Sequence, residues 1–140
     1  MVCRDDIVNE ARTWIGVKWK HQGRTRDGID CAGLIVLVGK SLGLTNYDYT
    51  EYRRHSQSVN FADYFLDGGG IKKNAKDVSA GDILIFRQVQ YPCHSAIVSK
   101  KNGILHIIHS YVPRRVVFEE SLSKLWLERR IYAFSYPGIE

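Results

Sequence analysis

The fold of this chain is decided by the stretch Asp30-Cys-Ala-Gly-Leu-Ile-Val-Leu-Val-Gly-Lys-Ser-Leu-Gly43. Asp30 can accept hydrogen bonds from the first turn of a helix, and Gly43 can end one in the left-handed region. The apolar run at residues 34–38 would also suit a buried strand. The cap, the glycine stop and the length of the segment favour a buried helix over residues 31–42, with Cys31 in its first turn.

Cys31 is then placed among unpaired backbone N–H groups at the positive end of a helix. Such a position lowers the pKa of a thiol and populates the thiolate, which is its nucleophilic form. Gly28 and Gly33 leave room for backbone or substrate to approach closely. A free cysteine is also commonly a small buried apolar side chain, so the helix position alone leaves both roles open.

The residues before this helix predict a second helix and a loop. Apolar side chains recur at helical spacing from Ile7 to Ile15, after two acidic residues that can cap, which predicts a helix over residues 6–15. Residues 16–28 are polar and contain scattered glycines, so they are expected to form a loop.

The residues after it change character downstream of Gly81. A short helix is expected over residues 60–66, and residues 122–126 suggest one or two further helical turns. Runs rich in Ile, Val, Phe and Tyr predict strands over residues 82–87, 95–100, 104–111, 115–119 and 131–136. Turn residues at 101–103 and 112–114 join neighbouring strands. Helices followed by meandering strands indicate an α+β fold with an antiparallel sheet, formed by a single domain over residues 1–140.

Cysteine catalysis needs a base and commonly a third group that orients the base. His94 precedes the apolar residues 95–98, and His109 lies late in the following strand, so a hairpin at 101–103 would bring both to one edge of the sheet. His106 competes for the third position. Because it is three residues from His109, it faces the other side of the same strand, and both faces are apolar. Periodicity therefore leaves His106 and His109 open.

Composition excludes several classes of function. The net charge is +5, and the 20 Lys and Arg are spread along the chain, which indicates a solvated surface with some attraction to an acidic polymer such as a bacterial envelope. A nucleic-acid binder would show a basic stripe interleaved with aromatics, so no nucleic-acid partner is expected. Three cysteines are an odd number without framework spacing, which argues against a disulfide-stapled module. Cys31, Cys93 and His94 lack the spacing of a metal site, so no metal or organic cofactor is expected.

The N-terminal residues lack the apolar core of a signal peptide. No apolar run approaches the roughly 20 residues of a membrane span. We therefore expect a chain without a membrane span that is made as a soluble cytoplasmic product, wherever it acts later.

Five short motifs in order give the sequence a recognisable pattern. They are Gly16-Val-Lys-Trp-Lys-His-Gln-Gly23, Asp30-Cys-Ala-Gly-Leu34, Ala80-Gly-Asp82, His94-Ser-Ala-Ile97 and Ile108-His-Ser110. Together they resemble the NlpC/P60 family of cell-wall cysteine peptidases over residues 11–137. The His-Gln-Gly-Arg before the cysteine and the ending Arg-Arg-Ile-Tyr-Ala-Phe-Ser-Tyr-Pro are similar to a branch found among tail or baseplate proteins of phages and gene transfer agents.

The resemblance implies a papain-like fold with the nucleophile at the N-terminus of a helix that packs on an antiparallel sheet. It implies Cys31 as nucleophile, His94 as base and His109 as the orienting residue. Trp19 occupies the place of an aromatic residue, most often Tyr, near the site. Since Trp19 has no phenolic O–H, its indole N–H, or the backbone N–H of Cys31 with another donor, would have to complete the oxyanion hole. Asp30 is expected to cap the helix and to be structural rather than catalytic.

The activity implied by the resemblance is hydrolysis of an amide in the stem peptide of bacterial peptidoglycan, between D-Glu and diaminopimelate. A tail-borne enzyme of this kind would be virion-associated, would act on the wall in the periplasm and would have phage tail or baseplate proteins as partners. An acyltransferase or amidase on the same Cys-His scaffold is one alternative. A non-catalytic tail or wall-binding module is another, although the intact Cys-His-His set argues against it.

Overall fold

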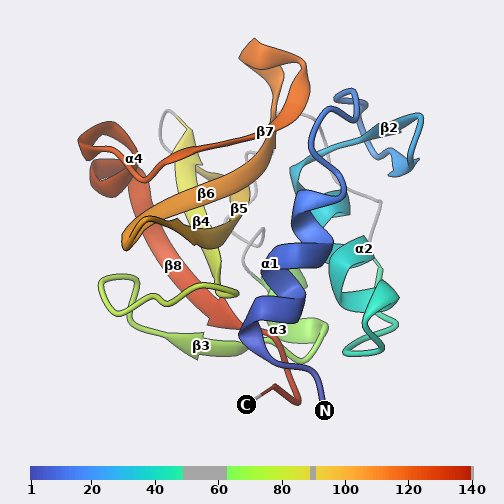
Figure 1. Cartoon of the computed structure of the whole chain (residues 1–140), viewed down its shortest axis with the longest axis horizontal. Coiled ribbons are helices and arrows are strands. Elements are labelled where there is room, and N and C mark those ends of the chain that lie inside the picture. The colour runs from blue at the N-terminus through green and yellow to red at the C-terminus, as the bar shows by residue number, and fades with distance from the viewer. Residues whose placement is uncertain (49–62, 89–90, 140) are drawn as a thin grey trace.

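The computed structural model describes residues 1–48, 63–88 and 91–139 (Figure 1). Two helices come first, α1 (Arg4–Arg12) and α2 (Cys31–Ser41). The predicted loop between them contains a two-stranded ribbon formed by β1 (Arg24–Thr25) and β2 (Gly28–Ile29). The helix predicted over residues 6–15 begins and ends earlier than expected. It begins earlier because the Asp6 carboxylate accepts the Cys3 backbone N–H at 2.9 Å and caps the helix from within its first turn.

One antiparallel sheet of six strands follows, in the order β3-β8-β4-β5-β6-β7. The strands are β3 (Ile71–Lys73), β4 (Ile83–Gln88), β5 (Tyr91–Lys101), β6 (Ile104–Tyr111), β7 (Val116–Ser121) and β8 (Arg130–Ser135). Strands β4 to β7 form a meander, and β8 returns to pair with the free side of β4. The predicted α+β class with an antiparallel sheet is confirmed.

Strand alternation gives the sheet two different faces. Side chains such as Ile83, Ile97 and Ile108 pack against α1 and α2. The neighbouring positions form a second cluster on the other face, around Trp126 of α4 (Lys124–Arg129). Figure 1 shows α4 on the side of the sheet away from α1 and α2. We call these the α2 face and the α4 face.

The remaining elements are short. The helix expected over residues 60–66 corresponds to α3 (Asp63–Asp67), and residues 60–62 lie outside the described ranges. The sequence did not predict β3, because three residues with two lysines show no alternation. The turn at 112–114 is a 3-10 helix, η1 (Val112–Arg114). No helix in the described part of the chain is long and apolar enough to cross a membrane.

A buried carboxylate joins α1 to the sheet. Asp82 is fully buried and accepts hydrogen bonds from Arg4 Nη1 and Lys73 Nζ, both at 2.7 Å. It also accepts the Ser79 backbone N–H and the Ser135 hydroxyl, both at 2.8 Å. Burial alone would raise the pKa of the Asp82 carboxyl, but these hydrogen bonds outweigh it and hold the pKa below its ordinary value.

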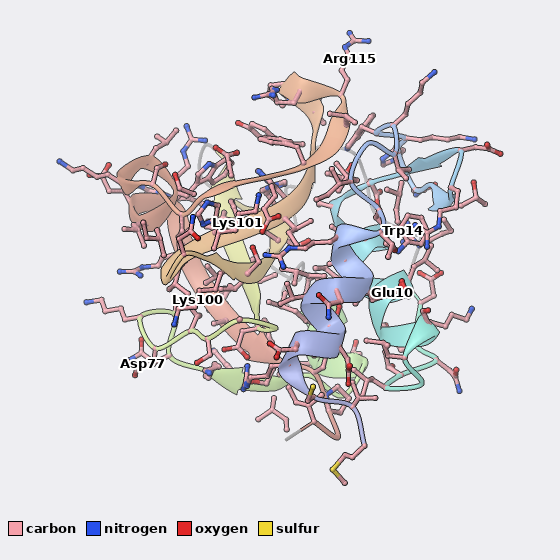
Figure 2. All side chains as sticks on the ribbon, viewed as in Figure 1. Glu10, Trp14, Asp77, Lys100, Lys101 and Arg115 are labelled. Atoms are coloured by element: carbon pink, nitrogen blue, oxygen red, sulfur yellow. The ribbon has the colours of Figure 1, made fainter. Side chains whose placement is uncertain are left out.

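We predict that Asp82→Ala lowers the free energy of unfolding by about 3 kcal/mol, because Arg4 and Lys73 lose a desolvated partner. Asp77→Ala, at an exposed turn on the outside of the molecule (Figure 2), should change it by less than about 0.5 kcal/mol. Urea denaturation of the two variants measures the difference. Equal losses would contradict an anchoring role for Asp82.

Candidate active site

Cys31 is the first residue of α2 and is partly buried at the border of the α2-face core. The residues before it are attached to the sheet, because the Ser110 hydroxyl donates to the Ile29 carbonyl at 2.7 Å. Ser110 follows His109 on β6. This hydrogen bond therefore holds the Cys31 end of α2 at the end of β6 that carries His109.

Asp30 uses both carboxylate oxygens to fix the start of α2. Its Oδ1 accepts the Gly33 backbone N–H at 2.8 Å and Arg24 Nη1 at 3.1 Å, and its Oδ2 accepts the Gln22 backbone N–H at 2.7 Å. The side chain is 5% exposed. The geometry is that of a helix cap that also ties the preceding loop to the helix.

Gly33 and Gly28, singled out in the sequence, lie where neighbouring segments pack closely. A Cβ on Gly33 would lie 2.5 Å from the Gly23 carbonyl oxygen, and one on Gly28 would lie 2.6 Å from Lys20 Cβ. A side chain at either position would displace the loop from the helix start. These glycines therefore serve close backbone packing next to Cys31.

His94 and His109 form the centre of the site. His94 Nε2 and His109 Nδ1 are 2.8 Å apart across β5 and β6. The pairing of Lys101 with Ile104 and of Ile97 with Ile108 places both rings on the α4 face, where they are 4% and 0% exposed. Cys31 and this histidine pair thus flank the same end of β6 from the two layers of the fold.

His106 lies elsewhere. It pairs with Ser99, and its Nδ1 lies 3.0 Å from the Ile104 carbonyl oxygen of its own strand. The structure therefore brings His109, and not His106, against His94. The alternatives that periodicity left open are separated by the register of the hairpin.

Aromatic rings enclose the two histidines. Trp126 lies 5.5 Å from His94 and 5.2 Å from His109 between ring centroids, and Tyr111 lies 5.2 Å from each. Burial, with His109 and Arg129 nearby, lowers the pKa of His94 well below its ordinary value. Burial, with Arg114 nearby, lowers the pKa of His109 to about 3. Both imidazoles are therefore neutral near pH 7, which is the form that can accept a proton.

Glu120 on β7 extends the histidine pair and was missed in the sequence. Its Oε2 lies 2.8 Å from His109 Nε2, and its side chain is 33% exposed. The only signal was the pair Glu119-Glu120 at the end of the strand predicted over residues 115–119, since neighbouring residues of an extended chain face opposite sides. Glu119 faces α1 and binds Arg12, so only the register shows which glutamate reaches the histidines.

Trp19 lies beside the residues that precede Cys31. Its backbone bridges to Ile29, and its N–H donates to the Arg115 carbonyl at 3.0 Å. It lines an open cavity of about 420 Å³ with Lys18, Val112 and Arg115. Arg115 has a left-handed backbone, with φ at 59°, and stands at the tip between β6 and β7 (Figure 2). The surface beside Trp19 is therefore cationic.

The described residues contain no group of three or more His, Cys, Asp or Glu that could hold a metal ion. What they do contain is a cysteine at a helix start and a chain of two buried imidazoles and a partly exposed carboxylate. Such an arrangement can generate a thiolate and return a proton to a leaving group.

The family model described as the NlpC/P60 family matches residues 16–131. The chain belongs to the NlpC/P60 family. No curated protein matches its sequence.

The NlpC/p60 domain of the peptidoglycan hydrolase SagA is 23% identical with a TM-score of 0.66, and the match covers 96% of this chain and 99% of that one. An NlpC/P60 family protein from Bacillus cereus ATCC 10987 is 21% identical with a TM-score of 0.71, and the match covers 97% of this chain but 41% of that one. A protein similar to a lipoprotein of the NLP/P60 family from Staphylococcus aureus Mu50 is 22% identical with a TM-score of 0.65, over 96% of this chain and 41% of that one. These likenesses establish that the chain shares the NlpC/P60 fold. The papain-like architecture predicted from the sequence is therefore confirmed.

The low pKa values of the two histidines predict how the stability of this NlpC/P60 chain depends on pH. An unfolded histidine protonates below about pH 6.5 while the buried rings stay neutral, so stability falls as pH falls through this range. Between pH 6.5 and 5, the buried His109 ring should cost about 2 kcal/mol. His109→Asn should therefore show a shallower loss of unfolding free energy than the wild type in urea denaturation, whereas His106→Asn should follow the wild type. Parallel curves for His109→Asn and the wild type would contradict the neutral state of His109.

Proposed function

We propose that this chain is a cysteine peptidase that hydrolyses an amide bond in the stem peptide of bacterial peptidoglycan. The observation that carries the proposal is the buried His94–His109 pair at 2.8 Å, at the same strand end as a cysteine in the first turn of a helix, within an NlpC/P60 domain. Cys31 is the nucleophile, His94 the base and His109 the orienting residue.

The chemistry proceeds in two stages. His94 takes the proton from the Cys31 thiol, and the thiolate attacks the amide carbonyl. His94 then protonates the leaving amine, which leaves a thioester that water hydrolyses. Direct transfer requires the Cys31 sulfur and His94 Nδ1 to come within hydrogen-bond distance at this strand end, a geometry that often tightens only when substrate binds.

The developing oxyanion needs donors that lie near Cys31. The backbone N–H of Cys31 lies in the first turn of α2, where the helix dipole also favours negative charge. Trp19, on the adjacent segment, is the candidate for a second donor through its indole N–H. This assignment places the aromatic residue where the family commonly has Tyr.

The surface charges suit an anionic substrate. Lys18 and Arg115 line the cavity beside Trp19, and a stem peptide carries the carboxylates of D-Glu and diaminopimelate. SagA, whose domain has the same fold, is described as a peptidoglycan hydrolase. We take the bond between D-Glu and diaminopimelate as the specific target.

The setting of the reaction is also part of the proposal. The His-Gln-Gly-Arg segment and the ending of residues 129–137 resemble phage and gene-transfer-agent proteins. We propose that the chain is carried with a phage tail or baseplate and opens the wall locally from the periplasm during DNA delivery.

The thiolate should be detectable by its reactivity. Iodoacetamide near pH 6 should label Cys31 well before Cys3 or Cys93, because the helix start stabilises its thiolate, and activity should fall in step with labelling. Peptide mapping by mass spectrometry measures each rate, with Cys31→Ser as the control for background labelling. Labelling of all three thiols at one slow rate would refute the nucleophile.

The cleaved bond can be identified on purified Gram-negative sacculi. Wild-type protein should release muropeptides with a new free amino group on diaminopimelate and intact sugar bonds, whereas Cys31→Ala should release none. Mass spectrometry of the soluble fragments measures both. Acyl transfer without peptide cleavage would favour the acyltransferase alternative, cleavage next to the sugar would favour an amidase, and no product would favour a non-catalytic tail or wall-binding module.

A further inference from the structure

We propose that Glu120 is a positioning residue that fixes the protons on both histidines and leaves Nδ1 of His94 as the base. The inference rests on the proposed function for its catalytic meaning. Its structural content, the tautomer of each ring, can be measured without any turnover.

The argument begins with what Glu120 can donate. An ionised carboxylate only accepts hydrogen bonds, so His109 must donate its Nε2–H across the 2.8 Å contact. A neutral imidazole carries one N–H, and His109 Nδ1 must therefore accept. In the 2.8 Å contact with His94, the Nε2–H of His94 is then the donor. His94 is left with a lone pair on Nδ1, which is the atom that can take a thiol proton.

The surroundings of the two rings leave Glu120 as the group that decides this arrangement. The rings are enclosed by Phe86, Tyr111, Phe118 and Trp126, whose aromatic faces do not specify a tautomer. The reversed arrangement would point a lone pair of His109 Nε2 at the carboxylate and a proton of His94 Nδ1 at the nucleophile. Glu120 disfavours that arrangement by direct repulsion in a poorly solvated site.

Charge adds a second effect. Within the described ranges, the ionisable groups around the histidines include two arginines, Tyr111 of β6 and Glu120 of β7. Arg114 of η1 lies over the Phe118 ring at 4.4 Å, and Arg129 of α4 lies over the Trp126 ring at 5.6 Å. Both arginines disfavour a protonated imidazole, and Glu120 is the anion that opposes them. When His94 holds the thiol proton, the chain of hydrogen bonds connects its positive charge to this carboxylate. The proton leaves Cys31, resides on His94 Nδ1 and passes to the leaving amine, while Glu120 never carries it.

Three variants separate these effects. Glu120→Gln keeps an acceptor oxygen for His109 but removes the charge, and Glu120→Ala removes both. Glu128→Gln, at an exposed glutamate of α4, is the matched control. We expect Glu120→Ala to lower kcat by about 10- to 100-fold with KM changed less than about threefold, as for other residues that orient a reacting side chain. Glu120→Gln should recover only part of that loss, because it keeps an acceptor oxygen but not the charge, and Glu128→Gln should match the wild type.

The tautomers are read directly by ¹⁵N NMR of the histidine rings at neutral pH. The wild type should show Nε2–H and unprotonated Nδ1 on both His94 and His109, and Glu120→Ala should show mixed tautomers. Glu120→Gln, whose amide can donate as well as accept, should lie between the two. Wild-type His109 protonated at Nδ1, or spectra and kcat unchanged in Glu120→Ala, would overturn the positioning role. If the tautomers respond as expected while sacculi are not cleaved, the proposed function fails and the positioning of the rings stands.

Discussion

The arrangement of the site depends on the register of the hairpin between β5 and β6. Asn102 and Gly103 form a two-residue turn with φ values of 53° and 79°, so Lys101 pairs with Ile104 and each later pair follows. A slip of one residue would exchange the faces of β6. His109 would then enter the layer of α1 and α2, away from His94, while His106 would stay several residues along β5 from His94. One short turn thus determines whether the histidine pair forms.

Two buried carboxylates hold the helical layer to this sheet at a fixed distance. Asp82 binds Arg4 near the start of α1, and Glu119 binds Arg12 near its end, at 3.0 Å to Oε2. The ion pairs constrain α1 at both ends, and α2 packs against both α1 and the sheet. The start of α2 is then fixed by Asp30 and by the Ser110–Ile29 hydrogen bond. Polar contacts set the position of Cys31, while apolar burial supplies most of the stability.

The sequence predicted those parts of the fold that local patterns specify. The helix over residues 31–42 has a cap and a stop that act within a few residues, and it appears as α2 with Asp30 as its N-cap. The turn at 101–103 is equally local. The choice between His106 and His109 was not predictable, because both faces of β6 are apolar and only pairing with β5 distinguishes them. Glu120 was missed for the same reason, since its partner lies on another strand. The roles of Cys31, His94 and His109 remain predictions that the geometry accommodates.

Glu119 and Glu120 are neighbours on β7 but bind different partners, because the register of the strand places them on opposite faces of the sheet. Glu119 faces α1, where Arg12 and the Ser99 hydroxyl compensate its burial and lower the pKa of its carboxyl against the opposing effect of desolvation. Glu120 faces the histidines, where its acceptor oxygens meet an N–H in an aromatic surrounding. Exchanging the two faces would take Glu120 away from His109 and Glu119 away from Arg12. The pairing of β6 with β7 therefore matters to the proposed chemistry as much as the identity of either glutamate.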